Sequence, residues 1–472
     1  MLKRVVLLYT VVVGLSILAI VGMLQFGSQL LPSAAPAPAA AHADGFVAQI
    51  LAHAQHPLAK LILQLVVIVL AARLFGALAA KLGQPPVIGE IAAGILLGPS
   101  LLGWLSPAGA GFLFPPASIP TLGLLAQLGV LLFMFVVGTE LDPALMRGKA
   151  HAAVAVSHVS IVFPFLLGVT LAIGLYTSYA PKGVAFASFA LFCGVAMSIT
   201  AFPVLARIIE ERGYSGTPVG TTAIACAAVD DVTAWSLLAF VVAFTTSGGA
   251  FAALAVILLL STLFVLFMLY VVRPFLVKAL DPAKPGAGGR GSMAIVVAVM
   301  LGSALATELI GIHALFGAFL AGVIMPNGPG FRRMLRERFD TMSAVFLLPL
   351  FFAFTGLRTQ VGLLDDPRTW LVCLLIIFVA TLGKFGGTLG AARLTGLSWR
   401  ESLTLGALMN TRGLMELVAL NVGYELGILT PEIFTMMVLM ALVTTAMTGP
   451  LLTLTEKMGP ARDEAELAAG RA

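Results

Sequence analysis

The sequence predicts an all-α protein that crosses a membrane many times, and two observations carry this prediction. Of the 472 residues, 60% are hydrophobic and only 10% are charged, with a mean hydropathy of +1.05. About a quarter of the residues of a soluble protein are charged, so this composition belongs to a membrane protein. The apolar residues also fall into segments long enough to cross about 30 Å of hydrocarbon as helices.

The amino-terminal region, residues 1–57, contains an apolar segment at 5–26 followed by a Pro/Ala-rich linker at 33–43. Two interpretations are open. The segment is either a retained helix or a signal peptide cleaved after the Ala41-His42-Ala43 sequence. We expect the helix, because a signal peptide has an apolar core of only about 7 to 15 residues.

Residues 58–455 are expected to form the transmembrane domain, followed by a short cytoplasmic tail at 456–472. Each of its thirteen apolar segments can cross the bilayer as a helix. The segments are approximately 58–80, 85–104, 119–138, 150–175, 183–209, 219–244, 251–272, 293–309, 311–325, 339–357, 369–391, 401–422 and 429–454.

The positions of the 27 Lys and Arg residues test this arrangement, because short cytoplasmic loops carry an excess of positive charge. With the amino terminus inside, 20 lie on the cytoplasmic side and 4 outside, while Arg73, Lys384 and Arg412 lie within spans. This distribution predicts an inner cell membrane protein with both termini cytoplasmic, unless the first helix is cleaved. It also explains the net charge of +5 without a nucleic-acid partner.

The loop at 281–292 separates two sets of six segments, 58–244 and 293–454, which the segment 251–272 connects. The two sets begin on opposite sides of the membrane. The sequence therefore predicts an inverted repeat, a common construction among transporters.

The fifth segment of the first set and the matching segment of the second are both interrupted by polar or helix-breaking residues. Irregular backbone at membrane depth is tolerated where protein or a wet cavity satisfies it, and paired breaks indicate a transporter's central site. Kinked structural helices are the alternative. The residues that form the two breaks are Ser198, Thr200 and Pro203 in the first, and Asn410, Thr411 and Arg412 in the second.

Asp230 and Asp231 lie in the otherwise apolar stretch 223–239, AIACAAVDDVTAWSLLA. An ionised carboxylate within a membrane costs roughly 2.5 to 3.5 kcal/mol on insertion scales, so the pair is a candidate functional site. Consecutive residues of a helix point about 100° apart. One aspartate can therefore face a transport route while the other meets a neighbouring helix. A purely structural ion pair with Lys384 or Arg412 is the alternative.

Four charged residues are candidates for a supporting network. Lys384, among the glycines of 383–387, is either a structural counter-ion or a proton carrier. Arg412 and Glu416, at i and i+4, are expected to pair with each other. Glu90 either lines an entrance or satisfies the start of its helix.

These residues favour a secondary transporter of small monovalent cations, which prefer the oxygen ligands that carboxylates, hydroxyls and freed carbonyls supply. The sequence has no GxxxxGK[ST] motif for ATP, so we expect gradient-driven transport, with no enzymatic activity and no cofactor. A gated potassium efflux pathway without proton coupling is the alternative.

Eight stretches, in order along residues 58–454, resemble the monovalent cation:proton antiporter-2 family, which includes Kef-type and NhaA-like exchangers. They are GQPPVIGE at 83–90, GPSLLG at 98–103, FMFVVGTELD at 133–142, TAFPVLAR at 200–207, GIHALFGAFLAG at 311–322, LPLFFAFTGL at 348–357, GKFGG at 383–387 and MNTRG at 409–413, with the Asp230-Asp231 pair between the fourth and fifth.

This resemblance implies Na+ or K+ exchange for protons, a role in pH homeostasis, and a homodimer in the lipid bilayer with two crossed discontinuous helices. It implies that Asp231 is the main ligand of the monovalent cation and that Asp230 pairs with Lys384. The sequence departs from Kef-type members at its carboxyl end, where only the tail 456–472 follows and no nucleotide-binding domain is expected.

Overall fold

The computed structural model describes residues 56–140, 150–214, 217–247, 251–280, 289–326 and 329–458. The chain divides into two units, residues 1–60 and 61–472. Of the first unit the structure describes only residues 56–60, so the expected helix at 5–26 and its linker lie outside the described residues. Residues 459–472 of the expected tail also lie outside them.

The described residues are helical, without a strand. The elements of the first part of the chain are α3 (Pro57–Lys81), α4 (Pro86–Leu97), α5 (Leu102–Leu105), α6 (Pro107–Leu113), η1 (Pro116–Ser118), α7 (Ile119–Glu140), α8 (Ala150–Tyr179), α9 (Phe186–Ser198), α10 (Phe202–Glu211), α11 (Pro218–Thr246), α12 (Phe251–Phe267), η3 (Met268–Val272) and α13 (Arg273–Ala279). The remaining elements are α14 (Arg290–Ile310), α15 (Ala314–Val323), α16 (Pro329–Met342), η4 (Ser343–Leu347), α17 (Leu348–Arg358), η5 (Val361–Leu363), α18 (Pro367–Thr381), η6 (Leu382–Gly386), α19 (Gly387–Leu394), α20 (Trp399–Met409), α21 (Leu414–Glu425) and α22 (Pro431–Glu456).

Ten helical stretches of the described chain are long and apolar enough to cross a membrane. They coincide with ten of the thirteen predicted segments. The other three predicted segments contain shorter helices: α9 with α10, α15 alone, and α20 with α21. The all-helical membrane fold is therefore confirmed, whereas the number of crossings stays a prediction.

Both predicted interruptions are present, and each divides a segment into two short helices. Between α9 and α10 the backbone is extended at Ile199 (φ −72°, ψ 135°) and Ala201 (φ −92°, ψ 94°). Pro203 does not lie within a continuous kinked helix, which was the alternative interpretation. It lies in the first turn of α10, where proline fits because that turn needs no intrahelical N–H partner.

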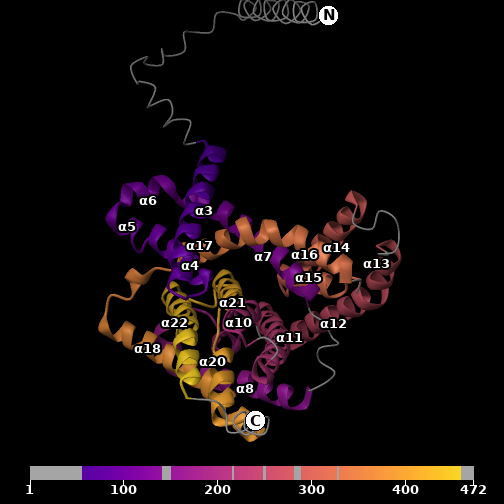
Figure 1. Ribbon diagram of the computed structural model, residues 1–472. Coiled ribbons are helices and arrows are strands. Elements are labelled where there is room, and N and C mark those ends of the chain that lie inside the picture. Colours follow the sequence, from indigo (N-terminus) through magenta and orange to yellow (C-terminus); the bar gives the residue numbers. More distant parts are fainter. Residues whose placement is uncertain are drawn as a thin grey trace, which may run out of the picture. The chain divides into compact units, whose positions relative to one another are not determined.

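Figure 1 shows α10, α20 and α21 close to α11 and α22, while α12 and α13 run along one side of the group. Contacts between α7 and α15 and between α4 and α17 hold other helices together. At the first contact a Cβ on Gly138 would lie 2.2 Å from the carbonyl oxygen of Phe319. Only glycine therefore permits this approach.

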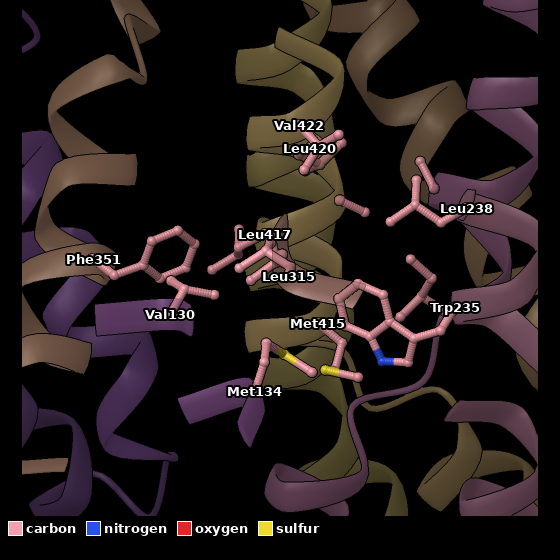
Figure 2. Packing of buried hydrophobic residues seen from close by; sticks show 14 of the residues in the cluster. Val130, Met134, Trp235, Leu238, Leu315, Phe351, Met415, Leu417, Leu420 and Val422 are labelled. Carbon is pink, nitrogen blue, oxygen red and sulfur yellow. The ribbon is translucent and has the colours of Figure 1, made fainter. Parts of the chain in front are cut away.

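Apolar side chains fill the space beside α21. Figure 2 shows Leu417 of α21 between Phe351 of α17 on one side and Trp235 of α11 on the other. All three side chains are buried. This packing surrounds the second break and one face of α11, so it positions the residues described next.

Candidate functional site

Asp230 is fully buried on α11 and lies at the centre of a polar cluster. The hydroxyl of Ser157 donates to Asp230 Oδ1 at 2.5 Å. The hydroxyls of Ser160 and Thr200 donate to Oδ2 at 3.1 Å and 2.7 Å. The ammonium of Lys384 lies 2.9 Å from the same oxygen. Four donors from three other segments thus surround this carboxylate, and one of them is the ammonium of a buried lysine.

Lys384 reaches Asp230 from η6, a π-helical turn between α18 and α19. Such turns are frequent at functional sites, because the extra residue changes the direction of a side chain. A Cβ on Gly383 would lie 2.8 Å from the Cα of Pro164, so glycine lets η6 approach α8. The Nζ of Lys384 also donates to the carbonyl oxygens of Ser160 and Ser198 at 3.0 Å and 2.6 Å. Buried Lys384 therefore has carbonyl acceptors besides its counter-ion.

The two helix breaks contact each other through the main chain. The amide N–H of Ala201 donates to the carbonyl oxygen of Thr411 at 3.0 Å. Thr200 Oγ1 lies 3.4 Å from the carbonyl oxygen of Met409. Backbone groups that the interrupted helices leave without intrahelical partners are thus satisfied across the crossing, as a membrane interior requires.

Arg412 lies within the second break and neutralises the end of α9. Its guanidinium donates to the carbonyl oxygens of Ala196 and Met197 at 2.8 Å and 2.7 Å. The carboxyl end of a helix carries partial negative charge, which a cation stabilises. Glu416 accepts from Arg412 at 2.5 Å, at the i,i+4 spacing that the sequence indicated.

Threonines of α22 support the second break. Asn410 donates to the carbonyl oxygen of Thr444 at 3.4 Å, and Thr411 and Thr448 share a hydroxyl hydrogen bond of 3.3 Å. The amide N–H of Arg412 donates to the hydroxyl of Thr445 at 3.0 Å. The irregular backbone is therefore held by a neighbouring helix.

Asp231, the next residue of α11, has different surroundings. Its side chain is buried, with 3% of its surface exposed, yet its Oδ1 has no hydrogen-bond partner among the described residues. It lines a small cavity whose walls are mainly apolar. The lining residues are Ile199, Asp231, Ala234, Trp235, Leu238 and Met415. Among the described residues, Asp231 Oδ1 thus makes no hydrogen bond that would hold α11 in place.

The charges of the cluster identify Asp231 as the unbalanced group. Asp230 pairs with Lys384, and Glu416 pairs with Arg412. These four side chains are fully buried and their charges sum to zero. An ionised Asp231 would add one negative charge in a place of low dielectric constant. Such a carboxylate needs either a proton or a monovalent cation.

The two remaining predicted residues are Ser198, at the end of α9, and Glu90, on α4. Ser198 donates to the carbonyl oxygens of Gly194 and Ile161 at 2.7 Å and 3.0 Å, so its hydroxyl does not contact Asp230. Glu90 is buried on α4, where its Cγ would lie 3.5 Å from a Cβ on Gly76 of α3. This position beside α3 is compatible with either interpretation of Glu90.

Sequence reasoning did not identify Ser157, Ser160 or Trp235. The sequence signals that could have identified them are the spacings of these residues along their helices. The two serines, at i and i+3, lie on one face of α8, and Trp235 lies four residues after Asp231 on the same face of α11. Neither spacing is specific by itself, because apolar helices contain many such pairs.

The sequence matches the family described as "sodium/hydrogen exchanger, transmembrane" over residues 66–455. The chain is 45% identical to a Na(+)/H(+) antiporter, NhaS4, of Synechocystis sp., over 82% of this chain and 95% of the relative. It is 40% identical to cation/H(+) antiporter 17 of Arabidopsis thaliana, over 87% of this chain and 50% of that protein. For K(+)/H(+) antiporter 1 of Saccharomyces cerevisiae the identity is 36%, over 84% and 46%.

The chain thus spans nearly all of the cyanobacterial relative but about half the length of the plant and yeast relatives. Among solved structures, the fold is similar to that of the sodium proton antiporter MjNhaP1 from Methanocaldococcus jannaschii. The TM-score is 0.58 at 14% identity, over 84% of this chain and 98% of that one. This similarity confirms the antiporter fold.

Proposed function

Because the chain belongs to the sodium/hydrogen exchanger transmembrane family, we propose that it exchanges a monovalent cation, Na+ or K+, for protons by alternating access. It is a multi-pass membrane protein of a transporter family. The relatives named as Na(+)/H(+), cation/H(+) and K(+)/H(+) antiporters support the exchange reaction.

The observation that carries the proposal is the difference in charge balance between the two adjacent aspartates. Asp230 has a lysine and three hydroxyls, whereas Asp231 Oδ1 has no partner among the described residues. One carboxylate that must bind either a proton or a cation makes the two ligands compete. Competition at a single site couples their movements in opposite directions.

The other residues would hold this site at the crossing. Asp230 and Lys384 would fix α11 against α8 and η6, and Thr200 would connect Asp230 to the first break. Arg412 would keep the ends of the two broken helices together. When the two broken helices move against the helices around them, the site would face the two sides of the membrane in turn.

Proteoliposomes with an imposed pH gradient and an internal pH-sensitive dye test the proposal. Addition of Na+, K+ or Li+, each against choline, should dissipate the gradient for the transported ion. Asp231→Asn should abolish this response, because an amide has no negative charge for which a proton and a cation can compete. Asp365→Asn is the matched control, since Asp365 is exposed and distant in sequence from the crossing.

Two results would contradict the proposal. Full cation-dependent proton flux in Asp231→Asn would remove Asp231 from the transport route. Cation flux without proton movement in the wild type would replace the exchanger with a channel-like pathway.

We also propose an inner cell membrane location, cytoplasmic termini and a homodimer. The native cysteines Cys193, Cys226 and Cys373 are buried, so introduced thiols can be labelled selectively. A membrane-impermeant maleimide should label Lys182→Cys in intact cells and Lys457→Cys only after lysis. The reverse pattern would overturn the orientation, and native mass spectrometry in detergent would test the dimer.

A further inference from the structure

Trp235 is the second buried polar group at the Asp231 cavity. It follows Asp231 by four residues on α11, and 5% of its surface is exposed. Its indole Nε1–H, like Asp231 Oδ1, has no hydrogen-bond partner among the described residues. Both side chains line the same cavity. Leaving a buried donor and a buried acceptor unsatisfied is costly, so the pair points to a ligand that contacts both.

The chemistry of the cavity limits what that ligand can be. Apart from Asp231 and Trp235, the lining side chains are those of Ile199, Ala234, Leu238 and Met415. None of these offers an oxygen ligand or a strong hydrogen-bonding group. Hard cations take oxygen ligands, and here the side chains supply only one carboxylate. A cation bound by Asp231 must therefore keep some of its water.

The indole ring of Trp235 is held by two phenylalanines of α15. It contacts Phe316 edge-on, with 5.4 Å between ring centroids, and stacks near Phe319 at 6.3 Å. Both phenylalanines belong to α15. Figure 2 shows the ring beside Met415, with its nitrogen on the side away from Leu238. This packing fixes the direction of the N–H and prevents it from turning to another acceptor.

We propose that Trp235 is a positioning residue whose indole N–H holds a water molecule against Asp231, and that the bound cation keeps this water as a ligand. The inference rests on the exchange function proposed above. As described, the cavity has room for about one water molecule, the bridging water, so its walls must move apart when the cation binds. Such a water has two polar partners in the protein, which is enough for an ordered buried water.

The geometry of water suits this arrangement. An indole N–H is only a donor, so it cannot ligate a cation itself. A water oxygen can accept from the indole with one lone pair and present the other to the cation. One of its O–H groups then donates to Asp231. Water-mediated bonds of this kind stabilise nearly as well as direct ones.

The first test is Trp235→Phe in proteoliposomes, which keeps an aromatic ring and removes the N–H. The cation concentration for half-maximal exchange should rise about three- to tenfold, the effect of one net hydrogen bond. The maximal rate should stay within about twofold, since the carboxylate remains. Trp370→Phe on α18 is the control, because that indole is 42% exposed. An unchanged half-saturating concentration, or a fall in the maximal rate alone, would overturn the inference.

The second test reads binding without transport. A variant with Trp104, Trp370 and Trp399 replaced by Phe leaves Trp235 as the one indole of the sequence. Its emission in detergent should shift saturably with NaCl or KCl at constant ionic strength against choline chloride. The same shift should vanish with Asp231→Asn. A variant that still exchanges ions but shows no shift would refute the role of Trp235.

The two tests separate this inference from the proposed function. If wild-type vesicles show no exchange while Trp235 emission still reports an Asp231-dependent cation, the exchange function fails and the binding inference stands. If exchange occurs but Trp235→Phe leaves the half-saturating concentration unchanged and the Trp235 emission does not shift, the inference fails and the exchange function stands.

Discussion

Asp230 and Asp231 are neighbours on α11, yet their surroundings differ. Asp230 has four donors within 3.1 Å, including a buried lysine. Asp231 faces a small apolar cavity and leaves an oxygen unsatisfied. The two residues are adjacent, so the direction of the side chain from the helix decides the difference.

This comparison shows how two adjacent buried carboxylates can have different functions. A carboxylate that holds helices together cannot release its partners without loosening the structure. A carboxylate that exchanges ligands must have no fixed partner. Adjacent residues on a helix point about 100° apart, so one helix can supply both kinds of carboxylate at the same depth.

Removal of the counter-ion should have the largest effect on stability. Lys384→Met leaves Asp230 buried without its cation, and breaking a buried pair costs about 3 to 5 kcal/mol. Unfolding in mixed detergent micelles would measure the loss. The double variant Asp230→Asn/Lys384→Met should recover more than half of it. A single variant as stable as the wild type would show that the pair does not hold α11 in place.

Ser157→Ala should have the next largest effect. Its hydroxyl bonds to an ionised carboxylate at 2.5 Å, and hydrogen bonds to charged groups contribute about 1.5 to 3 kcal/mol. Ser261→Ala is a control within an apolar helix, since that hydroxyl bonds only to the carbonyl oxygen of Ile257 in its own helix α12. The same unfolding assay should separate them, and equal losses would count against a special role for Ser157.

Thr200→Val should cost less, about 1 kcal/mol, because Asp230 Oδ2 keeps Ser160 and Lys384 as donors when this hydroxyl is lost. Oδ1, by contrast, receives its one short hydrogen bond from Ser157. Thr200→Ser retains the donor and should restore most of the stability. Thermal inactivation of purified protein would rank the two variants. If serine proved no better than valine, the methyl group rather than the hydrogen bond would be what matters.

Asp231→Asn should change stability least, by no more than about 0.5 kcal/mol, because no interaction of Asp231 Oδ1 with the protein is lost. The contrast with the Asp230 cluster is sharpest in this variant, which should unfold like the wild type although it fails to exchange ions. A loss as large as that of Ser157→Ala would mean that Asp231 also has a structural partner.

Much of the fold follows from apolar segment length, and both breaks follow from the polar residues and proline within apolar runs. The positions of Ser157 and Ser160 could not be predicted. Hydroxyls in apolar helices commonly bond to carbonyls of the preceding turn, so their sequence does not show that they face another helix. Pro203 was predicted to mark a break, with a kinked helix as the alternative, because one sequence cannot show that α9 ends before it.

The intramembrane charges left Lys384 and Arg412 as alternative partners of the aspartates. Only the family resemblance assigned Lys384 to Asp230, because their 154-residue separation gives no local signal. The cavity at Asp231 could not be predicted from the sequence either. It depends on how α11, α15 and α21 pack, and Trp235 gains its role from that packing. The cost of placing charged groups in a membrane indicated the candidate site residues. Packing decides what each of them contacts.

The hydrogen bond from Ala201 to Thr411 joins the two broken helices by main-chain atoms alone. Every residue type supplies the carbonyl, and every one except proline supplies the N–H. Natural variation at these two positions can therefore change the side chains without removing the bond. Selection at position 201 should act on side-chain volume, because Ala201 is fully buried. A saturation library should accept small residues at position 201 and reject proline.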